Sequence, residues 1–391
     1  MDLGNPDLYT STDRFALWEA RLAEGGAVWS EPGSSPGGFW SFFSHEDCNT
    51  VLSPVAPFTS EYGMMIGFDK EHPDRSGGHM LVVSEGSKHQ QLRRHIGPLM
   101  SRTAAQSLTS FIEQEVSELL ERLRERGGGD VAATFGPYLP AAVVCEILGV
   151  PQRDRAELID LTNHAFGGED QVFNGMTPRQ AHTAILVYFY DLIAQKRRRP
   201  GEDLVSVLLA DRSLTEEEVL LNCDNVLIGG NETTRHAIAG CFHALASAPD
   251  TLARLTGDRG LVDTAVEELI RWTSPAMHVL RVATEDTVVG GQPIARDTPV
   301  VAWLPAANRD PKVFDRPGLF LPDRTPNRHL AFGHGAHHCL GAALARVELG
   351  ALLRVLAEQV RGVGLAKDVE WLRALVVQGY RALHVELDWH R

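Results

Sequence analysis

The fold is decided by the stretch Phe332-Gly333-His334-Gly335-Ala336-His337-His338-Cys339-Leu340-Gly341, which leads into Ala342-Ala343-Leu344-Ala345-Arg346-Val347-Glu348-Leu349. The second part has the apolar spacing of a helix. Cys339 therefore lies where a glycine-rich loop enters a helix. The unpaired N–H groups and partial positive charge of a helix N-terminus favour a thiolate there. Gly333 and Gly335 permit a tight bend that can turn backbone amides toward the sulfur.

Taken alone, this stretch has three interpretations. A free cysteine behind a turn is often only a small buried hydrophobic residue. His334, His337, His338 and Cys339 could also bind zinc, although a single thiol without a second ligand pair at zinc spacing argues against it. The third interpretation is a haem iron held by one thiolate, a ligand that favours cleavage of the O–O bond.

The spacing of the stretch resembles the haem-binding signature of the cytochrome P450 family. Its fixed positions are filled by Phe332, Gly335, Cys339 and Gly341. The resemblance implies that Cys339 is the axial ligand of haem b (iron protoporphyrin IX). It also implies a mainly α fold with small β-sheets, the single triangular-prism domain of the family, here spanning residues 1–391. Matching motifs run from about residue 80 to the C-terminus.

Composition excludes several other classes of protein. The chain of 391 residues has a net charge of −14, which argues against nucleic acid or an anionic membrane as a partner. Its five scattered cysteines favour a reducing compartment over a disulfide framework. The N-terminus has no signal-peptide pattern, and no apolar run approaches the roughly 20 residues of a membrane span. We therefore expect a soluble, cytoplasmic, monomeric protein.

Helical periodicity dominates the chain. It predicts helices near residues 12–24, 104–126, 136–148, 178–198, 216–248, 262–273 and 341–360. Short apolar runs predict strands at residues 27–30, 39–43, 279–282, 287–301 and 375–387.

Basic side chains that would hold the haem propionates come from three regions. His89 and Arg93 are four residues apart and share one helix face. Without the resemblance they would be a solvated cationic face; with it, they match the His-x-x-x-Arg pair of the family, although Ser84-Glu85-Gly86 replaces the usual Asp-Pro-Pro. Arg281 and His337 match two further propionate-binding positions.

The long predicted helix contains Gly229-Gly230-Asn231-Glu232-Thr233-Thr234, which is an unusual sequence for an apolar helix. Two glycines inside a helix cost about 1 kcal/mol each, and buried polar groups cost more. The plain interpretation is a kink with polar groups facing water. Alternatively, the Thr233 hydroxyl bonds the Gly229 carbonyl and widens a groove over the iron. The stretch resembles the oxygen-activation motif of the family, which makes Glu232 and Thr233 the acid and alcohol that deliver protons to iron-bound dioxygen.

A structural motif is expected further along. Glu268 and Arg271 are three residues apart, so both charges lie on one helix face. The pair resembles the Glu-x-x-Arg motif of the family, whose third member would be Arg324. We expect this triad to support the fold and the haem site without taking part in the chemistry.

Substrate contacts are inferred from the family's substrate-contacting positions. They would be Met64, Met65, Phe68, Gly229, Met277, His278, Val279, Val377 and Gln378. Ordinary core packing is the alternative for the residues of the 57–83 loop. His278 and Gln378 interrupt apolar runs, so we expect at least one of them to hydrogen-bond a polar substrate group.

The sequence thus predicts a haem-thiolate monooxygenase that inserts one oxygen atom from O2 into an organic substrate. Gly229 to Thr234 followed by Arg235 resembles bacterial enzymes that tailor peptide natural products, some of which act on amino acids tethered to carrier proteins. Electrons would come from a ferredoxin and its reductase, docked near Arg94, Arg102 and His338. The alternatives are a peroxide-driven haem-thiolate enzyme, oxidative coupling in place of hydroxylation, and a helical zinc-binding module.

Overall fold

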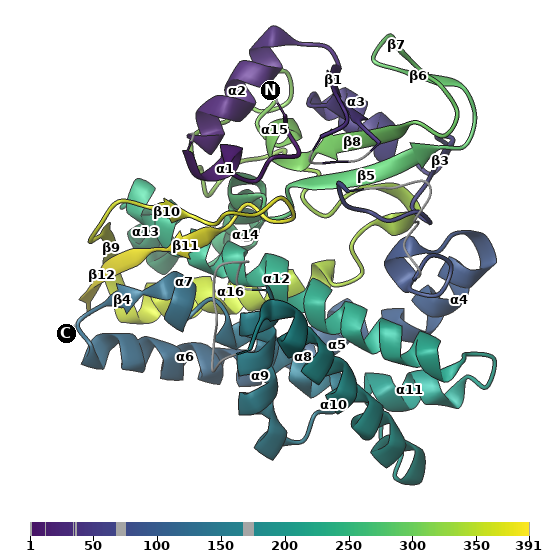
Figure 1. Cartoon of the computed structure of the whole chain (residues 1–391). Coiled ribbons are helices and arrows are strands. Elements are labelled where there is room, and N and C mark those ends of the chain that lie inside the picture. Colours follow the sequence, from purple (N-terminus) through teal and green to yellow (C-terminus); the bar gives the residue numbers. More distant parts are fainter. Residues whose placement is uncertain are drawn as a thin grey trace.

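The computed structural model describes residues 2–11, 13–33, 35, 37–67, 76–166 and 176–390. Helices make up most of this part of the chain, and one long helix, α12 (Glu216–Ser247), runs through the middle of the molecule (Figure 1). The N-terminal segments lie with strands β5 and β8 on one side of α12, and helices α6, α8, α9 and α10 lie on the other side (Figure 1).

The other helices are α1 (Leu8–Ser11), α2 (Arg14–Glu24), α3 (His45–Leu52), α4 (Gly86–Ile96), α5 (Arg102–Ser107), α6 (Thr109–Glu125), α7 (Val131–Thr134), α8 (Tyr138–Leu148), α9 (Gln152–Phe166), α10 (Pro178–Arg198), α11 (Leu204–Ala210), α13 (Thr251–Gly257), α14 (Leu261–Thr273), α15 (Leu304–Ala307) and α16 (Ala342–Gln359). Three short 3₁₀ turns lie at Leu81–Val83, Gly97–Met100 and Gly335–His337.

The strands are β1 (Val28–Ser30), β2 (Phe39–Phe42), β3 (Phe58–Thr59), β4 (Gly129–Asp130), β5 (His278–Ala283), β6 (Thr287–Val289), β7 (Gln292–Ile294), β8 (Pro299–Trp303), β9 (Val360–Leu365), β10 (Glu370–Trp371), β11 (Tyr380–Ala382) and β12 (His384–Trp389). The largest sheet has the order β1-β2-β8-β5-β3, in which only β2 and β8 are parallel. The others are β4-β12-β9 and the pairs β6-β7 and β10-β11.

The predicted mainly α chain with small sheets is confirmed. Each predicted helix lies within a few residues of its expected bounds, except that the helix expected at 104–126 is divided at Leu108 into α5 and α6. Prediction missed α3 and α9, which are rich in polar residues, and α11 and α13, which are too short to show helical periodicity. It also extended the helix at 341–360 one residue into β9. The predicted strand at 287–301 is interrupted by turns and forms β6, β7 and β8.

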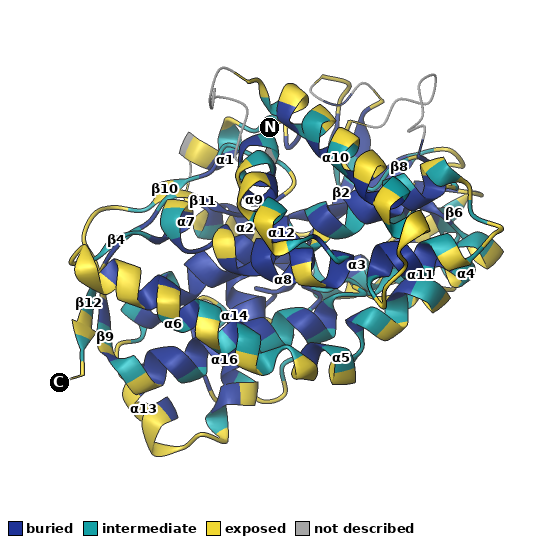
Figure 2. Ribbon diagram, turned by 90° about the horizontal axis from the view of Figure 1, so that it is seen from below, coloured by how far each residue is buried: buried dark blue, intermediate teal, exposed yellow. Residues whose placement is uncertain are grey.

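The largest hydrophobic core surrounds α12 and α8. Figure 2 shows both helices largely dark blue, whereas α6, α10 and α13 carry exposed outer faces. The stretch Val131–Leu148, which includes α8, has the length and hydropathy of a membrane span, but 78% of it is buried inside the protein. A core helix of a globular protein passes the same test, because it too is apolar on all sides.

The start of α12 is closed by a reciprocal cap between Thr215 and Glu218. The Thr215 hydroxyl accepts the backbone N–H of Glu218 at 3.2 Å, and the Glu218 carboxylate accepts the N–H of Thr215 at 2.8 Å. This reciprocal cap satisfies two N–H groups that the first turn of a helix leaves unpaired. The helix then continues without a break through Gly229 and Gly230 to Ser247. The predicted hydrogen bond from the Thr233 hydroxyl to the Gly229 carbonyl is present at 3.4 Å.

A buried ion-pair network fixes the segment that precedes the cysteine loop. The Glu268 carboxylate is fully buried and accepts two hydrogen bonds from Arg271, at 2.7 and 2.8 Å, and one from Arg324 at 2.9 Å. It also accepts the N–H of Leu321 and the side-chain amide of Asn327. The predicted triad is therefore assembled, with two further donors that the motif did not indicate.

Replacing Glu268 with alanine should destabilise the whole fold. Two buried guanidinium groups would lose their carboxylate, and breaking a buried pair in this way typically costs about 3–5 kcal/mol. We expect the free energy of unfolding of Glu268→Ala to fall by that amount. The matched control is Glu358→Ala, which removes the exposed ion pair with Arg259 and should cost about 1 kcal/mol or less. Equal stability of the two variants in denaturant titrations would contradict a structural role for the triad.

Candidate haem-thiolate site

Cys339 lies in the loop that precedes α16. The other four cysteines are buried, and Cys339 alone is exposed. Its backbone N–H donates to the Phe332 carbonyl at 2.8 Å, which closes the loop. Gly335 has a φ of +76°, and a Cβ there would lie 2.6 Å from the Leu52 carbonyl oxygen, so only glycine fits.

Burial and nearby donors have opposite effects on the pKa of the Cys339 thiol. One side of the residue is open, but the dense protein on the other side raises the pKa of the thiol by desolvation. The backbone amides of Gly341 and Ala342, at the start of α16, donate toward the sulfur and act in the other direction, as do the charges of Arg93 and Arg346. Amide donors and cations of this kind are what a metal-bound thiolate needs.

A basic cluster lies beside this loop. It consists of His89 and Arg93 on α4, Arg281 on β5 and His337 in the loop itself. The rings of His89 and His337 are 4.4 Å apart. Burial lowers the pKa of His89 to about 4, helped by the nearby His337 and Arg93. Burial also lowers the pKa of Arg281 to about 10, against the attraction of Glu85, so Arg281 stays charged at neutral pH.

Arg93 holds the cysteine loop directly. Its guanidinium donates to the carbonyls of Ala336 at 3.2 Å and His338 at 2.9 Å. Arg281 donates to the carbonyl of its own neighbour, Leu280, at 2.9 Å. The structure therefore brings the four predicted bases together, although Arg93 and Arg281 donate to backbone carbonyls.

Glu85 is a member of this site that sequence reasoning missed. Its carboxylate lies 3.1 Å from Nε2 of His337 and accepts the backbone N–H and the hydroxyl of Ser60, at 2.9 and 2.7 Å. Burial opposes ionisation, but the bonds from His337 and Ser60 prevail and lower the pKa of Glu85 to about 2. The only signal for it was the departure of Ser84-Glu85-Gly86 from the family pattern.

Glu232 and Thr233, the predicted acid and alcohol, are consecutive residues of α12. Gly229 is exposed with open space beside it, and Thr233 is half-buried with its hydroxyl 3.4 Å from the Gly229 carbonyl oxygen. Glu232 is buried. Burial raises the pKa of Glu232 to about 7, although the charge of Arg235 acts to lower it. A carboxyl with such a pKa can both donate and accept a proton near neutral pH.

Arg235 is the partner of this acid. Its guanidinium donates to Glu232 Oε1 at 3.0 Å, and both side chains are buried. The sequence placed Arg235 next to the motif without giving it a role. The i, i+3 spacing of Glu232 and Arg235 could have indicated the pair.

Two of the predicted substrate contacts are occupied by the protein itself. His278 accepts the Ile66 N–H at Nε2 and lies 3.0 Å from the Leu375 carbonyl through Nδ1. Gln378 accepts the indole N–H of Trp18 and donates to the Thr273 carbonyl. The expectation that one of them bonds a polar substrate group is therefore wrong for this structure, because these bonds tie down the loops on either side of β5.

Met277 and Val377 are also buried, and Met277 packs in the cluster that includes Leu280 and Trp303. Val279 is buried against a second cluster that includes Phe42 and Cys48. These residues present little or no surface to a substrate, contrary to expectation. Phe68 lies outside the described residues.

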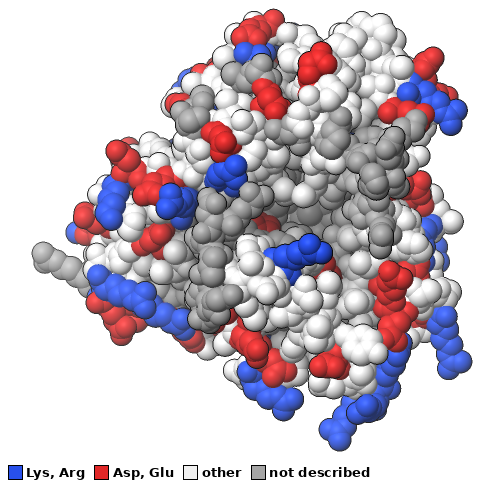
Figure 3. Space-filling model, in the orientation of Figure 1, with Lys and Arg blue, Asp and Glu red and all other residues white. Residues whose placement is uncertain are grey.

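Exposed apolar side chains are instead found in two loops next to β5, around residues 64–66 and 375–378. Met65, which was predicted, is 42% exposed, and Val376, which was not, is 41% exposed. The Met64 carbonyl accepts the N–H of Leu280, and the Val376 carbonyl accepts the N–H of Met277, so both loops are attached to β5. Figure 3 shows the face above α12 hollowed between the sheet region and the helical region.

The donor set fits a haem and does not fit zinc. One exposed sulfur with amide donors, and a cluster of bases able to bind carboxylates, match an iron porphyrin with its two propionates. Within the part of the chain that the structure describes, no three His, Cys, Asp or Glu side chains lie close enough to hold a metal ion. The histidines beside Cys339 thus do not complete a zinc site.

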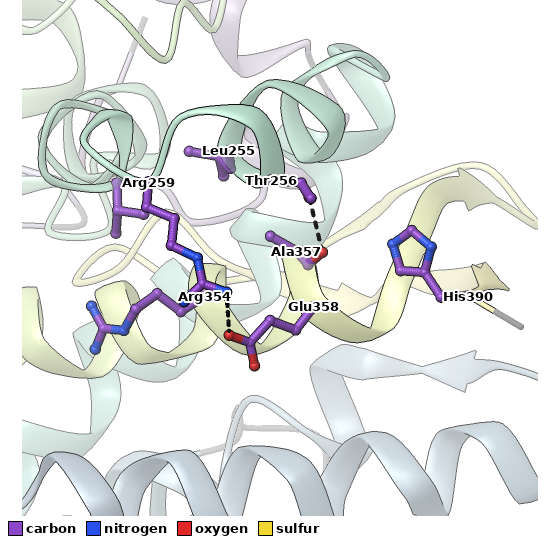
Figure 4. A pocket seen from close by; sticks show the side chains of 8 residues that line it. Leu255, Thr256, Arg259, Arg354, Ala357, Glu358 and His390 are labelled. Carbon is purple, nitrogen blue, oxygen red and sulfur yellow. Dashed lines mark hydrogen bonds and ion pairs between the residues drawn. The ribbon is translucent and has the colours of Figure 1, made fainter.

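Two surface pockets lie elsewhere. One of about 270 Å³ lies between α13, α16 and the C-terminal strand (Figure 4), where Arg259 pairs with Glu358 and the Thr256 hydroxyl donates to the Ala357 carbonyl. The other, of about 500 Å³, is lined by residues of α5, α14 and α16, including Arg102 and Arg346. In the first pocket Arg259 is paired with Glu358, and in the second Arg346 is paired with Glu267.

Comparison with known proteins identifies what the chain is similar to. The family model described as Cytochrome P450 matches residues 176–358. Cytochrome P450 NovI of Streptomyces niveus is 32% identical over 394 residues, covering 99% of this chain and 96% of the relative. The solved structure of P450 OxyD, described as involved in the biosynthesis of vancomycin-type antibiotics, is 62% identical with a TM-score of 0.96 and covers 100% of both chains.

A third similarity is to P450BioI, solved in complex with an acyl carrier protein that carries hexadec-9Z-enoic acid. It is 26% identical with a TM-score of 0.84, covering 98% of this chain and 100% of that one.

Ligation by Cys339 can be tested with the ferrous carbonyl spectrum. A thiolate ligand gives a strongly red-shifted Soret band, so Cys339→Ser should lose this band. Cys241→Ser is the matched control, because Cys241 is buried in the core and should leave the spectrum unchanged. A red-shifted carbonyl band in Cys339→Ser would refute the assignment.

Proposed function

The chain belongs to the cytochrome P450 family of haem b monooxygenases, and we propose that it tailors a bacterial secondary metabolite. More specifically, the substrate is an amino acid or a peptide that is presented on a carrier protein. The observation that carries this proposal is the full-length match to P450 OxyD at 62% identity, a protein described as acting in the biosynthesis of vancomycin-type antibiotics. The carrier-protein complex of P450BioI supports the mode of presentation.

The roles of the individual residues are also proposed. When bound, haem supplies the iron at which dioxygen is reduced and one oxygen atom is transferred to the substrate. Cys339 holds that iron, with Phe332 and Gly341 shaping the loop around it. The basic cluster of His89, Arg93, Arg281 and His337 binds the propionates, and Arg93 also fixes the loop. Met64, Met65 and Gly229 contact the substrate, together with Val376.

Proton transfer is assigned to Glu232 and Thr233. The Glu232 carboxyl, with a pKa of about 7, can exchange protons near neutral pH. The Thr233 hydroxyl is adjacent in sequence and borders the open space beside Gly229. The hydroxyl can pass a proton from the buried Glu232 carboxyl to the side of α12 that borders this open space. This pair favours a dioxygen-dependent enzyme over the peroxide-driven alternative, while oxidative coupling remains the alternative reaction on the same site.

A ferredoxin and its reductase are the proposed electron donors. Arg94 and Arg102 are exposed on α4 and α5, near the cysteine loop, and suit an acidic partner. His338 was expected to join them, but burial lowers its pKa, so it adds no charge at neutral pH. We further propose that residues 1–391 act as one cytoplasmic, monomeric domain; in support, a single core cluster joins residues from Leu81 to Val385.

The substrate proposal can be tested by the haem spin state. A set of amino acids is offered to the enzyme in three forms: free, loaded on a carrier protein, and as the unloaded carrier. At least one loaded carrier should shift the haem to high spin, because displacement of water by a bound substrate changes the iron's coordination. The free amino acid should bind at least about tenfold more weakly, since it lacks the contacts of the carrier. Equal affinity for the free amino acid would contradict carrier presentation.

The proton relay can be tested by measuring product and peroxide formed per reductant consumed. Thr233→Ala removes the hydroxyl, so oxygen should still be consumed while peroxide replaces product. Glu232→Gln keeps the shape of the side chain but cannot titrate, so turnover should fall by about 10²–10⁴-fold with little change in substrate affinity. Fully coupled turnover in both variants would mean that the pair is only an irregularity of the helix.

A further inference from the structure

The aromatic ring of Phe332, at the start of the cysteine loop, is in contact with a positive charge from α16. The Phe332 carbonyl closes this loop, because it accepts the backbone N–H of Cys339. Arg346 lies in the second turn of α16, and its guanidinium carbon is 4.7 Å from the centre of the Phe332 ring. A cation at this distance over an aromatic face is attracted to the ring. The charge of Arg346 is therefore held against the loop that carries the thiol.

A carboxylate from another helix fixes Arg346 in this position. Glu267 of α14 accepts hydrogen bonds from Nε and Nη2 of Arg346, at 2.5 and 3.0 Å. Two parallel bonds of this kind fix the plane of a guanidinium group as well as its position. Glu267 also accepts a hydrogen bond from Nε2 of His329 at 3.1 Å, and the His329 ring lies 5.8 Å from the Phe332 ring. Glu267 thus binds both Arg346 and the chain that leads into the cysteine loop.

Glu267 and Arg346 carry opposite charges that act on the site together. Burial opposes the ionisation of Glu267, but the bonds from His329 and Arg346 prevail and lower its pKa to about 2. Burial raises the pKa of the Cys339 thiol, and the charge of Arg346 acts in the other direction, so its field reaches the sulfur. The carboxylate that holds Arg346 therefore also offsets part of that field.

A second ion pair on α16 has no such relation to the loop. Arg354, two turns further along, donates to Glu113 of α6 at 3.1 Å. Its side chain is 34% exposed, against 38% for Arg346. At 1.5 Å per residue, Arg354 lies about 12 Å farther along the helix than Arg346. The Arg354 pair joins α16 to a neighbouring helix without touching Phe332, so the placement of Arg346 over the ring requires a separate explanation.

We propose that Glu267 and Arg346 together set the reduction potential of the haem iron. Arg346 supplies a positive charge beside the thiolate loop. Glu267 is a positioning residue, which holds this charge over Phe332 and offsets part of it. Reduction adds one electron to the site, so a nearby positive charge favours the ferrous state and a nearby negative charge favours the ferric state. This inference rests on the proposed ligation of haem by Cys339 and is independent of the substrate.

The test is a redox titration of the haem-loaded enzyme with small mediators, in the absence of substrate and protein partner. Glu267→Gln keeps the shape and an acceptor oxygen but removes the negative charge, and Arg346→Gln removes the positive charge. Arg346→Lys keeps the charge without the planar fork. Arg354→Gln is the matched control, because it breaks an ion pair of similar exposure on the same helix. The ferrous carbonyl spectrum of each variant shows whether the thiolate ligand is intact.

Glu267→Gln should raise the potential, and Arg346→Gln should lower it. We expect each change to alter the ratio of reduced to oxidised enzyme by roughly three- to tenfold, which is about 28–59 mV for one electron. The double variant should return toward the wild type, because the two lost charges cancel. Arg346→Lys should lie closer to the wild type than Arg346→Gln, and Arg354→Gln should match the wild type.

Loss of packing alone has no reason to move the potential in opposite directions in the two variants. Shifts of the same sign in Glu267→Gln and Arg346→Gln, or no shift in either, therefore overturn the proposal. A shift in Arg354→Gln as large as that in Arg346→Gln also overturns it, because the contact with Phe332 would then be irrelevant.

Failure of the proposed function gives a different result. A wild-type enzyme without the red-shifted carbonyl band would overturn ligation by Cys339, and this inference with it. A wild-type enzyme that shows the band but responds to no carrier-bound compound would overturn the substrate proposal alone, and the potentials of the variants would still decide the role of Glu267 and Arg346.

Discussion

The structure depends on one buried carboxylate. Glu268 accepts hydrogen bonds from Arg271, Arg324, Asn327 and the Leu321 amide, so α14 is tied to the irregular chain between α15 and the cysteine loop. That segment has no regular secondary structure of its own to hold its position. A buried charge surrounded by donors has few alternative arrangements, because any other leaves a charge unpaired in a low dielectric. The Glu268 network therefore fixes the position of the segment that leads into the Cys339 loop.

A second buried ion pair, between Glu232 and Arg235, lies on α12 in the core. Gly229 and Thr233 border open space on one face, whereas Glu232 and Arg235 form an ion pair on the neighbouring flank. The helix stays regular at its glycines because its many apolar contacts with α8, α10 and α14 outweigh their low helix propensity. A rigid helix holds the acid and the alcohol at a fixed separation, which an opened helix would not.

Motifs of local sequence could be predicted because short-range geometry determines them. The helix after Cys339, the cap at Thr215 and the pairing of Glu268 with Arg271 all follow from spacings of one turn or less. The substrate side was predicted poorly, because whether Met277 or Val376 faces open space depends on how two distant loops attach to β5. His278 shows the same limit: a histidine in an apolar run looks available, but its two nitrogens bond loops that lie far away in sequence. Glu85 was missed because its partners, Ser60 and His337, are likewise distant.

The basic cluster shows why geometry matters more than net charge at this site. His89 is neutral at neutral pH, since burial lowers its pKa to about 4, so of these groups Arg93 and Arg281 contribute positive charge and Glu85 removes part of it. In the proposed assignment, the net positive charge of Arg93, Arg281 and Glu85 would be smaller than the negative charge of the two propionates. Directed hydrogen bonds from His89, His337 and the guanidinium groups would then add to the attraction between charges. Arg93 connects the basic cluster to the Cys339 loop, because its guanidinium donates to two backbone carbonyls of that loop.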